Sequence, residues 1–139
     1  MRMVVLQSAT EVRKDFSRFI DQVIHKGPAF VRRSRDEFAA LSLDQLELLL
    51  APYRFHLDHG REKDGSVSGG LREVDLVGNA ASLEALKGSL AQDLIDYAQE
   101  YRANFELYYH APNRRGHLPY VLQVLLQENA QAVAELIDA

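Results

Sequence analysis

The side chains best suited to chemistry in this 139-residue sequence are basic ones gathered near its start. Residues 1–35 hold eight Lys and Arg residues against three Asp and Glu residues, a net charge of +5. Because the whole chain carries −4, the remainder carries −9. An Arg guanidinium reads guanine through two hydrogen bonds, and a Lys contacts phosphate as a point charge. This contrast predicts one surface for a polyanion and another for a cationic partner.

Histidines offer a second possible chemistry. His56 and His59, with Glu62 nearby, could form a metal cluster, but strand positions 56 and 59 point to opposite faces unless the chain turns. His110 and His117 flank a loop rich in Pro and Gly, and no nucleophile or carboxylate partner can be assigned to them. We therefore expect no catalytic residue, no metal site and no cofactor, and a histidine-based metal protein is the least favoured alternative.

The composition is that of an ordinary globular chain, with 47% hydrophobic and 26% charged residues. The absence of Cys excludes a disulfide scaffold and a thiolate zinc site. No apolar run approaches the roughly 18 residues of a membrane span, and the start lacks the apolar stretch of a signal peptide. We expect a cytoplasmic protein of one or two small domains without a membrane partner.

The first fifty residues predict the order β-α-β-β-α. A short strand at residues 3–6 precedes Ser8 and Glu11, which have the spacing of a capping box at a helix start. That helix continues to Gly27 on an apolar stripe, residues 29–33 and 38–42 form a hairpin, and a short helix covers residues 43–50. Three short strands and one long helix cannot bury both faces of a sheet, so a homodimer or higher homo-oligomer is expected. The stripe consists of Val12, Phe16, Ile20, Val23 and Ile24.

The predicted first helix places its basic residues away from this stripe, so they can face DNA. The helix N-terminus, with its free N–H groups and dipole, favours a phosphate beside Ser8 and Thr10. Lys14 and Arg18 stand at i and i+4 with like charge, which makes a plain solvated face a less satisfactory explanation, although that alternative stays open. The candidate DNA-binding residues are Ser8, Thr10, Arg13, Lys14, Arg18, Arg32, Arg33 and Arg35.

Residues 1–52 also match the order and spacing of a known family. The matching positions are the strand at 3–6, the helix start at 8–13, Phe16 and Ser17 with Ile20, residues 26–28, the strand ending at Arg33, and residues 39–42 leading into Leu43 and Leu46. This segment resembles the N-terminal domain of the Phd/YefM antitoxins. The resemblance implies a dimer that binds operator DNA and represses its own toxin–antitoxin operon, with DNA-facing arginines at the positions of Arg13 and Arg33.

Beyond residue 52 the pattern changes to short strands followed by a long amphipathic helix. Alternation predicts a strand at 53–57, a turn at 58–65, a weak strand at 66–71 and a short apolar segment at 74–78. A helix is then predicted at about 82–110, and a final helix at about 118–137 that starts near Pro119. The long helix carries one stripe over about seven turns. Its members are Leu83, Leu86, Leu90, Leu94, Tyr97, Tyr101, Phe105 and Tyr108.

A weaker resemblance covers residues 53–97. The turn at residues 63–66 and the helix start at residues 78–85 resemble the small domain of HicB-type antitoxins, although the third strand of that domain is missing from the predicted elements. The resemblance implies that this region neutralises a toxin. The aromatic ladder suits the core or a partner surface, and the acids at 93, 96 and 100 could meet a basic toxin or form a solvated face. The candidate toxin-binding residues are Asp93, Tyr97, Tyr101, Phe105 and Tyr108.

The sequence as a whole therefore predicts an α+β protein with a dimerising DNA-binding domain at 1–52 and a toxin-interaction domain at 53–139. The expected function is that of a type II antitoxin, a non-enzymatic protein with operator DNA and a cognate, basic toxin as partners. A stand-alone DNA-binding regulator without a toxin is the main alternative.

Overall fold

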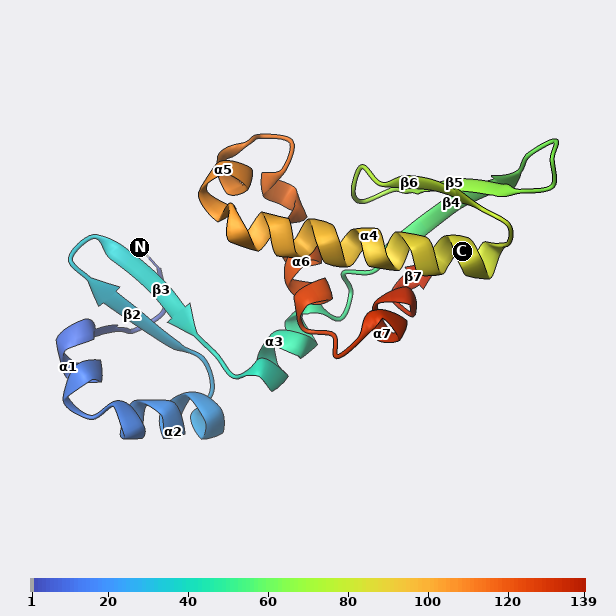
Figure 1. Cartoon of the computed structure of the whole chain (residues 1–139). Coiled ribbons are helices and arrows are strands. Elements are labelled where there is room, and N and C mark those ends of the chain that lie inside the picture. The colour runs from blue at the N-terminus through green and yellow to red at the C-terminus, as the bar shows by residue number, and fades with distance from the viewer. Residues whose placement is uncertain (1) are drawn as a thin grey trace. The chain divides into compact units, whose positions relative to one another are not determined.

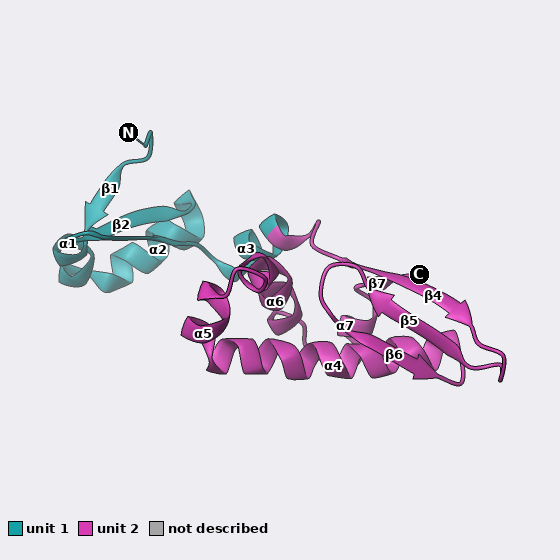
Figure 2. Ribbon diagram, turned by 90° about the horizontal axis from the view of Figure 1, so that it is seen from above, with its two compact units in different colours: residues 1–49 teal, residues 50–139 magenta. Residues whose placement is uncertain are grey.

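The computed structural model describes residues 2–139, and the chain divides into two compact units (Figure 2). Unit 1 covers Met1–Leu49 and unit 2 covers Leu50–Ala139. Each unit has its own small sheet, three-stranded in unit 1 and four-stranded in unit 2, together with helices. The expected α+β class is confirmed.

Unit 1 follows the predicted order, with one additional helix (Figure 1). Its sheet has the order β1-β2-β3, in which β1 pairs parallel to β2 and β2 pairs antiparallel to β3. Ser34, in the two-residue turn of the hairpin, has a φ of +55°, the left-handed backbone that such tight turns use. The elements are β1 (Leu6–Ser8), α1 (Ala9–Lys14), α2 (Phe16–Lys26), β2 (Ala29–Arg33), β3 (Asp36–Ala40) and α3 (Leu43–Leu50), whose last residue belongs to unit 2.

The single long helix expected from Ser8 onward is wrong, because the chain breaks at Asp15. This residue has φ −147° and ψ 80°, and its carboxylate accepts a hydrogen bond from the Arg18 N–H at 3.1 Å. Asp15 therefore ends α1 and caps the start of α2. The first strand is also displaced, since β1 begins at Leu6 rather than at residue 3.

The break changes which apolar side chains are buried in unit 1. The core consists of Phe19 and Val23 from α2 together with Ala29 and Val31 from β2. The predicted stripe placed Phe16, Ile20 and Ile24 in the core, but all three are exposed, at 58%, 46% and 49%. The sequence offers α2 two adjacent apolar faces, and the sheet covers only the face that carries Phe19 and Val23.

Unit 2 packs a long helix against one face of a mixed sheet. The sheet order is β6-β5-β4-β7, antiparallel except for the parallel β4–β7 pair. Figure 1 shows α4 running along this sheet. The elements are β4 (Phe55–Arg61), β5 (Val67–Leu71), β6 (Val77–Ala80), α4 (Leu83–Ala103), α5 (Phe105–His110), the 3₁₀ turn η1 (Arg115–His117), α6 (Leu118–Leu125), α7 (Ala130–Ala134) and β7 (Ile137–Asp138).

Three predicted boundaries in unit 2 are wrong. The helix expected at 82–110 is interrupted at Asn104, with φ −123° and ψ 42°, and so forms α4 and α5. The helix expected at 118–137 is instead α6, α7 and the short strand β7. The strand expected at 53–57 begins at Phe55 and extends to Arg61, and residues 77–80 form a third hairpin strand, β6.

The core of unit 2 follows the predicted stripe of α4. Leu86, Leu90 and Leu94 are almost completely buried against the sheet, and burying each such side chain contributes about 1.5–3 kcal/mol. Gly78 allows the close approach, because a Cβ built there would lie 3.1 Å from Leu86 Cδ1. At the sheet's other edge, Arg54 Nε and Nη2 donate to the Asp138 carboxylate, both at 2.9 Å, which ties β7 to β4.

Candidate functional site

The exposed basic residues of unit 1 form the first candidate surface. Arg13 on α1 and Arg18 on α2 are exposed, and no ion pair within residues 2–139 involves either. Lys14 is exposed as well, but its Nζ lies 3.0 Å from the Glu11 carboxylate. The break at Asp15 places Arg13 and Arg18 on different helices, so their relative directions follow from the bend and not from a single helical period.

The predicted capping box at the start of α1 is only half formed. The Ser8 hydroxyl oxygen accepts a hydrogen bond from the Glu11 N–H at 3.1 Å, whereas the Glu11 carboxylate accepts from Lys14. One lone pair of Ser8 Oγ is therefore used by the cap. Thr10 is exposed in the first turn of α1.

The three arginines of the hairpin differ in their surroundings. Arg32 pairs with Glu37 at 3.2 Å, and Arg33 pairs with Asp36 at 3.0 Å, across the β2–β3 ladder. Arg35 is exposed in the turn, and the described residues give it no ion pair. Among the candidate residues, Arg35 and the two helical arginines are therefore the guanidinium groups most available to an external anion.

These ion pairs change the interpretation of the charge contrast. The segment with +5 ends at Arg35, immediately before Asp36 and Glu37, which fold back onto Arg33 and Arg32. Counted by structural unit, residues 1–49 hold eight basic and seven acidic residues, and residues 50–139 hold eight and thirteen, so the units carry +1 and −5. The sign of each unit agrees with the expectation, but the contrast is smaller.

A hollow of about 330 Å³ lies between β1, α1 and α2. Its rim carries Lys14 and Arg18 but also Glu11 and Asp15, so its charges nearly cancel. An anion would meet as many carboxylates as basic groups there. The basic candidates of unit 1 are therefore better described as separate exposed contacts than as one anion pocket.

The predicted aromatic ladder of unit 2 lies mainly inside the fold. Tyr101 is fully buried, its hydroxyl donates to the Arg114 carbonyl at 2.8 Å, and its ring stacks on Tyr108 at 5.4 Å between centroids. The Tyr97 hydroxyl lies 2.6 Å from Nδ1 of His117. These contacts join α4 to α5 and η1, so Tyr97, Tyr101 and Tyr108 hold the unit together.

Burial and charge set the protonation state of this cluster. The pKa of His117 is lowered, first by burial and then by the nearby Arg114 guanidinium. The Tyr97 side chain, as a hydrogen-bond partner, raises the pKa of Arg114. The lowered pKa favours the neutral imidazole of His117, which shares a hydrogen bond with the Tyr97 hydroxyl through Nδ1. The sequence pattern paired neither Arg114 nor His117 with the aromatic ladder, because Arg114 lies in the loop after α5 and His117 follows that loop.

The acidic candidates lie on the same helix. Asp93 is half-buried, whereas Asp96 and Glu100 are exposed. Gln92 Nε2 donates to the Asp96 carboxylate at 3.0 Å. A hydrogen bond with Glu100 raises the pKa of Tyr108. At least two carboxylates of α4 are thus available to a cationic partner.

Helix α5 presents apolar side chains that the sequence pattern only partly identified. Phe105, a candidate residue, is 45% exposed, and Leu107, which was not a candidate, is 71% exposed. Tyr109 lies between the Phe105 ring at 4.9 Å and the Arg115 guanidinium at 4.6 Å. Of the five predicted toxin-binding residues, Phe105 is the one that projects most into solvent.

The histidines do not gather into a site. His56 Nδ1 lies 2.7 Å from a Glu73 oxygen, while His59 occupies the opposite strand face, and His117 is bound to Tyr97. Across residues 2–139, no group of three His, Cys, Asp or Glu side chains is arranged to hold a metal ion. In the same residues, no helix is long and apolar enough to cross a membrane.

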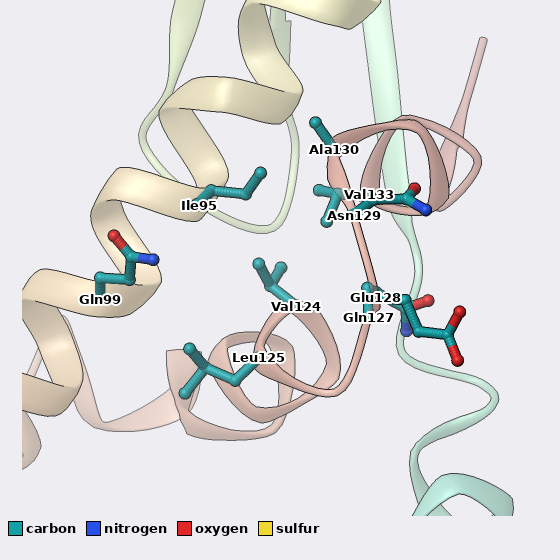
Figure 3. A pocket seen from close by; sticks show the side chains of 9 residues that line it. All are labelled: Ile95, Gln99, Val124, Leu125, Gln127, Glu128, Asn129, Ala130 and Val133. Carbon is teal, nitrogen blue, oxygen red and sulfur yellow. The ribbon is translucent and has the colours of Figure 1, made fainter.

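A groove of about 210 Å³ lies between α4, α6 and α7 (Figure 3). Ile95, Val124, Leu125 and Val133 form its apolar part. Figure 3 shows the Glu128 carboxylate directed away from Ile95 and Val124. Its one titratable lining residue is thus turned away from the apolar part of the groove.

Comparisons with known proteins agree with this picture. A family model named PHD_like, described as antitoxin of toxin-antitoxin, RelE / RelB, TA system, matches residues 3–139. A crystal structure from Syntrophomonas wolfei subsp. wolfei, described as an antitoxin part of a proposed toxin/antitoxin system, is similar to the chain with 38% identity and a TM-score of 0.91, over 98% of each chain. No curated protein matches the sequence.

Proposed function

The chain belongs to the PHD_like family of antitoxins, and from this premise we propose that unit 1 binds operator DNA and unit 2 neutralises a cognate toxin. The protein is the antitoxin of a toxin–antitoxin system. Operator DNA and a toxin are partners of different chemistry, and the chain divides into two units of opposite net charge. That division is the observation that supports the proposal most directly. The proposed mode of action is binding in the cytoplasm, without catalysis.

The DNA contact is proposed for the exposed arginines of unit 1. Arg13, Arg18 and Arg35 are free of ion pairs within residues 2–139, so no internal bond has to break before they bind phosphate or a base edge. Ser8, the N-cap of α1, and Thr10 and Lys14 within α1 lie on the same segment as Arg13. Arg32 and Arg33 would first have to leave Glu37 and Asp36, so we assign them a secondary part.

Homodimerisation through unit 1 is supported by its exposed apolar side chains. Phe16, Ile20 and Ile24 are spaced by four residues along one face of α2, and Phe38 on β3 is 53% exposed. An isolated unit of 49 residues with such a surface would gain stability by covering it. A two-fold dimer would also present two copies of each arginine to a palindromic operator.

The narrower family likeness remains a proposal. The order of β1, the α1–α2 pair, β2, β3 and α3 supports a Phd/YefM-like unit 1. In unit 2, three strands, β4, β5 and β6, precede the long helix α4. The third of them, β6, was missing from the elements predicted for the HicB-like segment. These orders support both resemblances at the level of topology.

Toxin binding is proposed for the outer face of α4 and for α5. Asp93, Asp96 and Glu100 supply negative charge, and Phe105 supplies an apolar contact. A basic toxin would complement the −5 of unit 2. Tyr97, Tyr101 and Tyr108 support this surface from within, because Tyr101 is buried and the other two are half-buried.

Two measurements on the full chain test the proposal. The first is a mobility-shift titration with the DNA upstream of its own gene, and the second is co-purification with the product of the adjacent reading frame. We expect both complexes, and we expect Asp96→Lys to weaken toxin retention more than Glu84→Lys, which makes the same charge change at the other end of α4. DNA binding without any retained neighbour product would instead favour a stand-alone regulator.

A further inference from the structure

Strand β6 forms an open edge of the unit 2 sheet. It pairs with β5 on one side, and the sheet order places no strand on its other side within the described chain. Val77 is 78% exposed, and Asn79 is also exposed. An open edge presents unpaired backbone N–H and C=O groups to any strand of matching register.

The register of the hairpin identifies which groups are unpaired. The Leu71 N–H donates to the Leu76 carbonyl at 3.0 Å, so this carbonyl is directed toward β5, while the Leu76 N–H donates to the Val74 carbonyl at 2.9 Å. Backbone direction alternates along an antiparallel ladder. Gly78 and Ala80 therefore also bond to β5, whereas Val77 and Asn79 direct their N–H and C=O groups outward. In residues 2–139, no loop hydrogen bond reaches these four groups.

This edge lacks the protection that strand edges usually have. Natural edges carry charged residues or Pro, or are covered by another element. The edge strand β3 of unit 1 carries Asp36 and Glu37, and β7 closes the opposite edge of the unit 2 sheet beside β4. Strand β6 has the sequence Val-Gly-Asn-Ala, which contains neither a charged residue nor a Pro.

The pattern of outward groups is self-complementary. In an antiparallel pair of two β6 strands centred on Gly78, Val77 of each copy lies opposite Asn79 of the other. Such hydrogen-bonded residue pairs exchange both N–H···O bonds, so this register satisfies all four outward groups of each copy. Asp75 then lies opposite Ala81 of the second copy, so like charges do not meet across the axis.

We propose that unit 2 associates with a second copy of the chain by two-fold antiparallel pairing of β6, forming a continuous eight-stranded sheet. The α4 helices of the two copies then lie on the same face, because the Gly78 side of each strand faces Leu86 and Leu90 of its own α4. This interface is separate from the proposed dimer of unit 1. A chain with both interfaces assembles beyond a dimer.

The test uses Val77→Pro in the full chain. Proline removes the outward N–H of residue 77 but none of the hydrogen bonds to β5, so the variant is expected to fold. Val77→Thr, which keeps the N–H and suits a strand, is the matched control. Molar mass by size-exclusion chromatography with light scattering, together with circular dichroism and the melting temperature, reports assembly and folding.

We expect Val77→Pro to reduce the molar mass to half that of the wild type or less, while Val77→Thr leaves it unchanged. An equal mass for the wild type and a folded Val77→Pro, whether monomeric or oligomeric, overturns the proposal. The proposed unit 1 dimer fails separately if Ile20→Lys, which places a charge on the exposed face of α2, leaves the mass unchanged.

Cysteine cross-linking tests the register without relying on the proline variant. The chain has no Cys, so introduced thiols are unique. In the proposed register, residues 77 and 79 of different copies lie about 5.5 Å apart at Cα, within disulfide range, while two copies of residue 77 lie roughly 9 Å apart. A mixture of Val77→Cys and Asn79→Cys chains should give disulfide-linked dimers, and Val77→Cys alone should not. Equal cross-linking of both samples, or none in the mixture, overturns the register.

Discussion

Among single residues, Gln123 shows how a buried polar group joins distant segments of unit 2. Among the described residues, Gln123 is the one polar residue that is buried. Its Nε2 donates to the Leu50 carbonyl at 2.8 Å. Gln127 Nε2 in turn donates to Oε1 of Gln123 at 3.3 Å. Gln123→Leu removes this donor while the Leu50 carbonyl keeps the Tyr53 N–H at 2.9 Å, so the expected cost is that of one hydrogen bond, about 0.5–1.5 kcal/mol. We expect a lower melting temperature, and Gln99→Leu, a matched change at an exposed site on α4, should change it little.

His117 gives unit 2 a dependence on pH. Because its pKa is lowered in the fold, the unfolded chain binds a proton more readily than the folded chain. Stability is therefore complete above the ordinary histidine value of 6.5 and falls as the pH drops below it. Urea unfolding between pH 5 and 8 measures this loss. His117→Gln should flatten the profile, and the exposed His110→Gln should not; a steep acid loss in His117→Gln would assign the effect to another group.

The sequence predicted local caps correctly but could not predict ion pairs across strands. Ser8 was expected to cap the first helix, and its oxygen does accept from the Glu11 N–H at 3.1 Å. A cap depends on residues three apart, which a sequence displays directly. The ion pairs of Arg32 and Arg33 with acids of β3 depend on the hairpin register. The predicted returning strand began at residue 38, so Asp36 and Glu37 were not placed opposite these arginines. For that reason the candidate set contained arginines that are already neutralised.

At the level of elements, the sequence predicted the type of each segment better than its continuity. The apolar period passes through Asn104 without interruption, because Tyr101, Phe105 and Tyr108 remain in contact after the helix bends. Periodicity alone therefore cannot locate such a break. Strand β7 was missed for a different reason: it has only two residues, and its partner β4 lies about eighty residues away.

The break at Asp15 is the element-level feature that most affects the proposed DNA surface. Asp15→Ala removes the cap of α2 and should destabilise unit 1 by about 1 kcal/mol. Asp15→Asn removes the same charge but keeps a capping oxygen, so it should retain stability. Thermal unfolding and an operator mobility shift should separate the two variants, with weaker binding only for Asp15→Ala. Equal behaviour of the two variants would mean that charge, and not the bend, is what matters at this position.

For the whole molecule, net charge is a poor guide to function, because charges of opposite sign lie in different units or neutralise one another within one. The total of −4 disfavours nucleic acid when taken alone, and the +5 segment overstates the case for it. The structure assigns +1 to unit 1 and leaves four of its exposed arginines, Arg2, Arg13, Arg18 and Arg35, outside any ion pair of the described residues. The position of free guanidinium groups should therefore govern DNA binding more than the total charge does.

Two arginine variants of equal net charge test this conclusion. Arg13→Ala removes one charge from unit 1, and Arg102→Ala removes one from the exposed end of α4 in unit 2. Each phosphate that a protein neutralises adds about −0.9 to the slope of log affinity against log salt concentration. Arg13→Ala should therefore weaken operator binding. It should also make the slope shallower by about 0.9 for each phosphate that Arg13 neutralises. Arg102→Ala should leave both the affinity and the slope unchanged. If both variants weakened binding equally, a long-range effect of total charge would account for the result, and Arg13 would be removed from the DNA surface.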